Sequence, residues 1–138
     1  MNPYNKYQEQ TSPSWTRIDM LLALYDGAVD RCEQALSALA GGDTVAAKAR
    51  LVKARLIVMG LASGVVADGD PVTTDILRLF EFCLHQLEKG GEADMRSALN
   101  VLRILREGFQ KIRPEAVELE RRGAIPPINT QTTLQAMA

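Results

Sequence analysis

The sequence predicts an all-α protein, an antiparallel up-down four-helix bundle with an extended N-terminal arm and a loose C-terminal tail. Apolar residues recur at intervals of three and four along most of the chain. This is the spacing of one face of an α-helix and not the alternation of a strand. Short segments rich in glycine and aspartate separate the apolar runs, and short connections favour antiparallel neighbours. The apolar residues are mostly aliphatic, with three Tyr, three Phe and one Trp.

Charge and composition exclude several classes of function. Sixteen basic and seventeen acidic residues give a net charge of -1, so we expect no binding of nucleic acid. No uncharged apolar run reaches the roughly 18 residues that a membrane span needs, and we recognise no secretory signal. Cys32 and Cys83 both fall on apolar helical faces, which indicates buried, reduced thiols. We therefore expect a cytoplasmic protein with one folded domain.

The first long helix is predicted over residues 17–40. Thr16 stands at the N-cap position, and the Asp19 carboxylate falls in the first turn, where it meets free N–H groups and the positive end of the helix dipole. Gly27 lies inside the helical period. Because glycine costs about 1 kcal/mol relative to alanine in a helix interior, we expect Gly27 to permit the close approach of another element. We interpret Tyr25 in the same way, as a packing residue.

Residues 1–15 form an N-terminal arm in this interpretation. Pro3 and Pro13 interrupt helical structure, and polar residues fill the gaps. The arm nevertheless carries three of the aromatic residues, Tyr4, Tyr7 and Trp15. We therefore expect part of the arm to lie on the body of the protein.

Three further helices follow the first. They are predicted over residues 44–63, 71–88 and 93–120. Asp43 is the expected N-cap of the second helix, and Asp70 followed by Pro71 is the expected start of the third. Glycine pairs end the first and the third helix, which gives the short connections of a bundle.

The helix over residues 93–120 carries the most regular pattern, a heptad seam. Pro114 lies inside this seam, and because proline removes a backbone hydrogen bond, we expect a kink or a break near residues 113–114. Residues 16–122 then form the bundle domain, and residues 123–138 a flexible tail. The long seam leaves open an alternative fold, an elongated dimer in which helices pair between chains.

The helix over residues 44–63 is apolar on two opposite faces, whereas a bundle helix normally has a polar outer face. One face is sufficient for the core: Ala47, Leu51, Ala54, Val58, Leu61 and Val65. The opposite face carries Val45, Val52, Leu56 and Met59. Three interpretations stay open: exposed side chains without a role, a groove for an amphipathic helix of a partner, and a surface for self-association or for cover by the arm.

Basic residues border this second face. The helix carries four of them and no acidic residue: Lys48, Arg50, Lys53 and Arg55. They form either a solvated rim or a means of steering an acidic partner. A milder apolar excess is predicted for Leu79 and Phe82 on the third helix and for Val101 and Ile104 on the fourth.

The sequence shows no motif that is typical of catalysis or of metal binding. His85 is the one histidine, and a metal site needs more ligands. There is no phosphate-binding glycine loop, no nucleophile elbow and no Cys-x-x-Cys. We therefore expect no enzymatic activity, no cofactor and no metal.

Several short strings of residues are informative together. The most specific is Leu24-Tyr25-Asp26-Gly27-Ala28, with Asn5-Lys6-Tyr7 ahead of it. Weaker strings are Ala54-x-x-Ile57-Val58-x-x-Leu61, Leu79-Phe80-Glu81-Phe82 and Leu105-Arg106-Glu107-Gly108-Phe109. Over residues 5–112 these strings resemble the FliS family of flagellin export chaperones. The chain departs from the family at Arg17, often a proline, at Phe80 and Phe82, near usual tyrosine positions, and at Phe109, often a tryptophan. The extension that begins at Pro114 also lies outside the family pattern.

The resemblance implies a cytosolic chaperone of flagellar type III secretion. Such a protein binds the disordered C-terminal segment of flagellin, blocks premature filament assembly and delivers the subunit to the export gate. It also implies that Tyr7 covers part of the groove in the free state. The expected partner-binding residues are Tyr7, Val52, Leu56, Met59, Leu79, Phe82, Val101 and Ile104. The expected oligomeric state is a monomer or weak homodimer. The alternative is a structural bundle whose apolar stripe on residues 44–63 is a self-association interface.

Overall fold

The computed structural model describes residues 15–65 and 69–124, and within these residues it contains five helices and no strand. The helices are α2 (Arg17–Ala40), α3 (Thr44–Ser63), α4 (Pro71–Lys89), α5 (Glu92–Lys111) and α6 (Arg113–Arg121). The predicted all-α class is confirmed. The proposed arm, apart from Trp15, and nearly all of the proposed tail lie outside the described residues.

Local capping explains where the helices begin. Thr16 and Asp19 form a capping box, in which the Thr16 hydroxyl accepts the Asp19 N–H at 3.3 Å. The Asp43 carboxylate accepts the Ala46 N–H at 3.0 Å at the start of α3. Asp70 caps α4 in the same way, and a proline at the first turn follows it. The N-caps predicted from the sequence are therefore confirmed.

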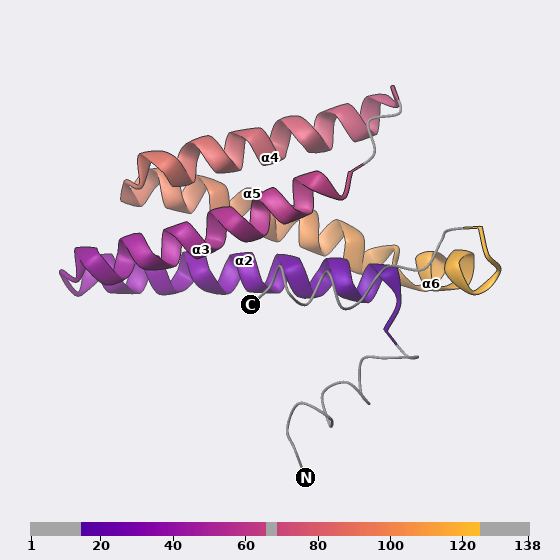
Figure 1. Ribbon diagram of the computed structural model, residues 1–138, viewed down its shortest axis with the longest axis horizontal. Helices are drawn as coiled ribbons and strands as arrows, with labels where there is room; N and C mark the ends of the chain where they lie inside the picture. The colour runs from indigo at the N-terminus through magenta and orange to yellow at the C-terminus, as the bar shows by residue number, and fades with distance from the viewer. Residues whose placement is uncertain (1–14, 66–68, 125–138) are drawn as a thin grey trace, which may run out of the picture.

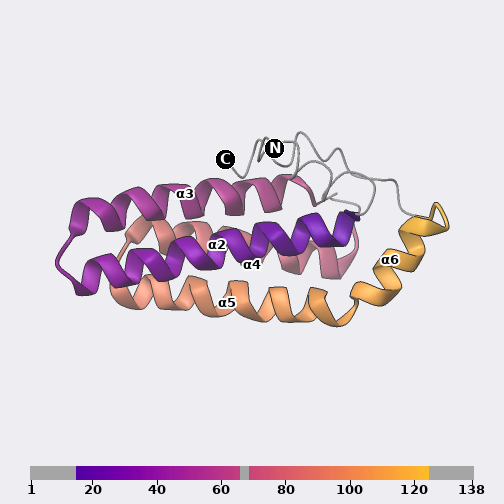
Figure 2. The same cartoon turned by 90° about the horizontal axis from the view of Figure 1, so that it is seen from below.

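The first four helices pack as a ring in which α2 contacts α3 and α5, and α4 contacts the same two helices. Figure 1 shows these helices side by side, with successive helices running in alternate directions, and Figure 2 shows α3 and α5 on opposite sides of α2. This arrangement is compatible with the expected up-down four-helix bundle. The fifth helix, α6, projects at one end of the ring and contacts the start of α2.

The last predicted helix is two helices in the structure. α5 ends at Lys111, Ile112 leaves the helical geometry with ψ near 4°, and α6 begins at Arg113. Pro114 occupies the first turn of α6, where its missing N–H has no intrahelical partner to lose. The heptad seam therefore does not continue as one straight stripe, and Ile112 is 49% exposed.

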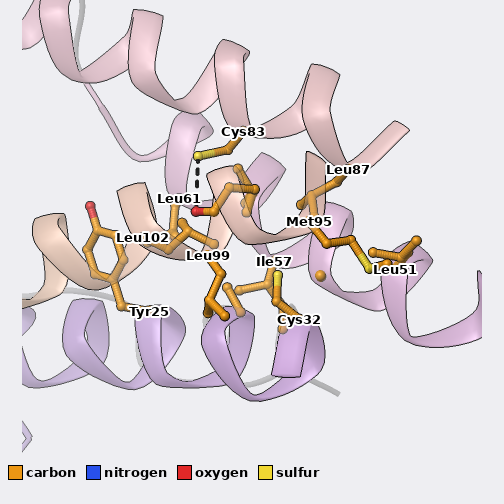
Figure 3. Packing of buried hydrophobic residues seen from close by; sticks show 14 of the residues in the cluster. Tyr25, Cys32, Leu51, Ile57, Leu61, Cys83, Leu87, Met95, Leu99 and Leu102 are labelled. Carbon is orange, nitrogen blue, oxygen red and sulfur yellow. Dashed lines mark hydrogen bonds between the residues drawn. The ribbon is translucent and has the colours of Figure 1, made fainter. Parts of the chain in front are cut away.

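The core lies between all four helices of the ring, and Figure 3 shows its packing. Tyr25 is fully buried in this core, with its ring stacked on Phe109 at 5.6 Å between centroids and tilted against Phe80 at 6.3 Å. Cys32 and Cys83 are buried free thiols, and the Cys83 thiol lies 3.8 Å from the Ala98 carbonyl oxygen. Burial raises the pKa of each thiol to about 12. The predicted packing role of Tyr25 is confirmed.

At Gly27, α2 lies close to a side chain of α3. A Cβ atom at this position would lie 3.3 Å from the Ile57 Cδ1 atom, closer than an ordinary contact between carbon atoms. The expectation that Gly27 permits close approach is therefore confirmed. Met20 lies seven residues earlier on the same side of α2 and is also fully buried, as is most of Leu24. Met20 is not one of the residues of the core cluster between the four helices of the ring.

A row of ion pairs that the sequence pattern did not indicate connects α2 to α5 and α6. Three acidic side chains spaced seven residues apart on α2 face three arginines that follow in the opposite order. The pairs are Asp19–Arg113 at 2.7 Å, Asp26–Arg106, and Glu33–Arg103 at 2.5 Å. The Glu120 carboxylate also accepts the backbone N–H of Arg17 at 2.7 Å. These contacts join α6 to the start of α2 and run along the contact between α2 and α5.

Candidate functional site

The outer face of α3 carries a row of apolar side chains that the bundle leaves exposed, and we call Val45, Val52, Leu56 and Met59 the α3 stripe. Their exposed fractions are 78%, 53%, 57% and 52%. The opposite face of the same helix is buried: Ala47, Leu51, Ala54, Ile57, Val58 and Leu61. Because the buried face of α3 already supplies apolar side chains to the core, the α3 stripe is not needed for the core of the bundle.

The predicted residues of α4 and α5 differ in how far they are exposed. Leu79 is 36% exposed, Phe82 41% and Ile104 60%. Val101 is partly buried and packs against the core. In the ring, α2 and α4 lie between α3 and α5 (Figure 2). The stripe on α3 and Ile104 on α5 therefore do not form one continuous surface. The structure therefore groups Val52, Leu56 and Met59 and separates them from the α5 residues.

Tyr7, the remaining predicted contact residue, lies outside the described residues. Trp15, the first described residue, borders a shallow cleft of about 550 Å³ between the start of α2 and the end of α5. The cleft is also lined by Asp19, Leu22, Ala23, Asp26, Arg106, Gln110 and Arg113. Its charged side chains pair with one another, Asp19 with Arg113 and Asp26 with Arg106. The cleft is therefore a part of the α2–α5 contact that sequence reasoning missed, because its existence depends on the helix register.

Side chains with chemical reactivity are not gathered at either surface. Within residues 15–65 and 69–124, no three His, Cys, Asp or Glu side chains lie close enough together to hold a metal ion. His85 is exposed on α4. Tyr25 is buried without a hydrogen-bond partner for its hydroxyl among the described residues, and burial raises its pKa well above the usual value. What the molecule presents is an apolar row bordered by positive charge.

A small all-helical domain with an exposed apolar helix face that does not contribute to the core belongs to the class of proteins that can bind an amphipathic segment of a partner. The model of the family described as flagellar protein FliS matches residues 1–116. The chain therefore belongs to the FliS family, a family of flagellar export chaperones. A comparison with curated proteins gives no match. Among the described helices, none combines the length and the apolar character required to cross a membrane.

Proposed function

We propose that this chain is a cytoplasmic export chaperone that binds the C-terminal segment of flagellin on the outer face of α3. Binding would prevent premature polymerisation and aid delivery to the flagellar type III secretion apparatus, with the export gate as a second partner. The observation that supports this most is the half-exposed row of Val52, Leu56 and Met59 on a helix whose opposite face is already buried. Membership of the FliS family supplies the flagellar context.

The α3 stripe can supply a useful but limited part of the binding free energy. Full burial of a large apolar side chain is worth roughly 1.5–3 kcal/mol, and Val52, Leu56 and Met59 are each about half exposed. Covering the remaining surface of the three then contributes about 3 kcal/mol, or about 100-fold in affinity. A tight complex needs further contacts. Leu79, Phe82, Val101 and Ile104 are the proposed ones on the described helices, which requires a segment long enough to pass around the bundle. Tyr7 is the proposed contact residue of the arm.

The charge around the α3 stripe favours a partner over a second copy of the chain. In a symmetric dimer the same patch would face itself. Lys48, Lys53 and Arg55 of one copy would then lie beside the same bases of the other, and such like-charge contacts oppose association. We therefore propose a monomer or a weak homodimer in the free state, with no nucleic-acid partner and no membrane insertion.

Titration calorimetry with a C-terminal flagellin peptide tests the proposed function. Leu56→Glu and Met59→Glu place a carboxylate in the centre of the stripe and should abolish measurable binding. Both positions are more than 50% exposed, so far-UV circular dichroism should show unchanged helical content. Val72→Glu is the matched control, because Val72 is 65% exposed on α4 and lies outside the proposed contact residues. Equal affinity of all three variants would exclude the α3 stripe as the binding surface.

Sedimentation of the free protein separates the proposal from the alternative, a structural bundle that associates through the α3 stripe. We expect a single monomeric species, or a weak dimer that Leu56→Glu does not alter. A tight dimer that dissociates in the Leu56→Glu variant would support the self-association interface instead.

A further inference from the structure

The basic residues of α3 are not balanced by acidic residues on the same helix. Between Thr44 and Ser63 the helix carries four bases and no acid. None of the four forms an ion pair with a described carboxylate, whereas Arg103, Arg106 and Arg113 are each paired with a carboxylate of α2. Because the whole chain has a net charge of -1, the remainder of the chain is acidic and α3 is a local concentration of positive charge.

Three of these bases, Lys48, Lys53 and Arg55, lie along the two edges of the α3 stripe. Ile57 lies beside Gly27 of α2 and therefore marks the side of α3 that faces α2. Leu51 would lie 3.5 Å from a Cβ atom added at Gly90, and it therefore marks the opposite side of α3, toward α4. At 100° per residue, Lys48 and Arg55 lie between the stripe and the α4 side. By the same helical geometry, Lys53 lies between the stripe and the α2 side. Arg50 lies on the α2 side as well, but farther from the stripe. A segment on the stripe would therefore have positive charge along both of its edges.

Two arginines near the stripe also have one nitrogen atom, the Nε, left without an acceptor among the described residues. The Nε atoms of Arg55 and Arg31 are buried and have no partner among the described residues. Arg31 follows Gly27 by one turn on α2, so it lies on the side of α2 that faces α3. Leaving a buried donor unsatisfied is unfavourable, and a carboxylate is the acceptor that best matches a guanidinium group. Each edge of the stripe therefore has an arginine that forms no ion pair with a described carboxylate.

From these observations we infer that the α3 stripe takes an amphipathic helix whose apolar face is bordered on both edges by Asp or Glu. The inference rests on the proposed function, because it specifies the chemistry of the segment bound at the same stripe. An anionic membrane surface is the less favoured occupant. The stripe has no aromatic side chain to anchor in a bilayer interface, and the acidic remainder of the chain would be repelled by an anionic surface.

Two synthetic peptides test the inference directly. Both carry the same Leu and Ala face, and their edge positions are Glu in one peptide and Lys in the other. Fluorescence anisotropy with the full chain should show binding of the Glu-edged peptide and at least about tenfold weaker binding of the Lys-edged one. Since salt screens exposed charge pairs, the affinity of the Glu-edged peptide should fall at least about fivefold between about 0.05 M and about 0.5 M salt. Equal affinity for both peptides would overturn the inference.

Charge-removing variants locate the effect on α3. Lys48→Gln combined with Arg55→Gln should weaken the Glu-edged peptide roughly 2- to 30-fold, as expected for two charge pairs at the surface. The control is Arg78→Gln combined with Lys89→Gln, which removes the same charge from exposed positions on α4 and should change affinity less than about twofold. Equal effects of the two double variants would show that only the net charge matters and would overturn the inference.

The flagellin C-terminal peptide distinguishes the inference from the proposed function. Binding that Leu56→Glu abolishes, but that salt and the Lys48→Gln/Arg55→Gln variant leave unchanged, would overturn the inference and keep the proposed function. Binding of the Glu-edged peptide without any binding of the flagellin peptide would support the inferred surface chemistry and overturn the proposed partner. Binding of vesicles rich in anionic lipid, lost in Leu56→Glu, with no binding of either synthetic peptide would overturn the inference in favour of a membrane surface.

Discussion

The contact between Gly27 and Ile57 permits a quantitative prediction for the packing of α2 on α3. Replacing a helix-interior glycine by alanine stabilises a helix by about 1 kcal/mol. Here the new Cβ would lie 3.3 Å from the Ile57 Cδ1 atom, so the Ile57 side chain must move by a few tenths of an ångström. If that movement turns a side-chain dihedral away from its staggered minimum, it costs about 0.5–1.5 kcal/mol. The two effects nearly cancel, and Gly27→Ala alone should change the free energy of unfolding by less than about 0.5 kcal/mol.

Ile57→Val removes the Cδ1 atom that the new Cβ would meet. The single substitution should cost about 0.5–1.5 kcal/mol, as for other buried Ile→Val changes. In the Ile57→Val background, however, Gly27→Ala should recover the full helix-propensity gain of about 1 kcal/mol. The coupling between the two substitutions is then about 1 kcal/mol. Urea denaturation followed by far-UV circular dichroism measures all four proteins. Additive effects, with Gly27→Ala equally stabilising in both backgrounds, would refute the interpretation of Gly27 as a close-approach residue.

Two further predictions concern titratable groups. The Arg113 guanidinium, with help from Thr16, holds the pKa of Asp19 below its ordinary value of 3.8; this stabilisation is present above pH of about 4 and is lost as the pH falls through the lower native pKa. Arg113→Gln should therefore lower stability at pH 7 and reduce its loss between pH 4 and 2, as urea denaturation at several pH values can show; an unchanged acid profile would contradict the assignment. Because burial raises the pKa of Cys32 and Cys83 to about 12, both thiols should resist a disulfide exchange reagent at pH 8 until the chain unfolds; rapid labelling of the native protein would contradict their burial.

The helices themselves were accessible from the sequence because their signals are local. Thr16, Asp43 and Asp70 cap three of them by hydrogen bonds within two or three residues. The two-faced character of α3 was also visible, since it depends only on a 3.6-residue period. Exposure of Leu56 and Met59 then followed once the opposite face was assigned to the core.

Features that depend on the register between helices were not accessible in the same way. The carboxylates on α2 meet arginines that lie far along the chain, 70 residues apart for Glu33–Arg103 and 94 for Asp19–Arg113. The positions of the carboxylates in the sequence do not identify the arginines that they meet, because the pairing depends on how α2 and α5 are aligned. The separation of Ile104 from the α3 stripe has the same origin, because a periodic pattern gives the face of a helix but not the position of that helix in the ring.

Methyl NMR of the full chain with a flagellin C-terminal peptide tests the central proposal most directly, because it reports on named side chains without a substitution. We predict that the methyl signals of Val52, Leu56 and Met59 shift or broaden on addition of the peptide, while those of the exposed control Val72 stay in place. Saturable binding with unchanged signals from all three α3 residues would contradict the assignment of the outer face of α3 as the flagellin-binding surface.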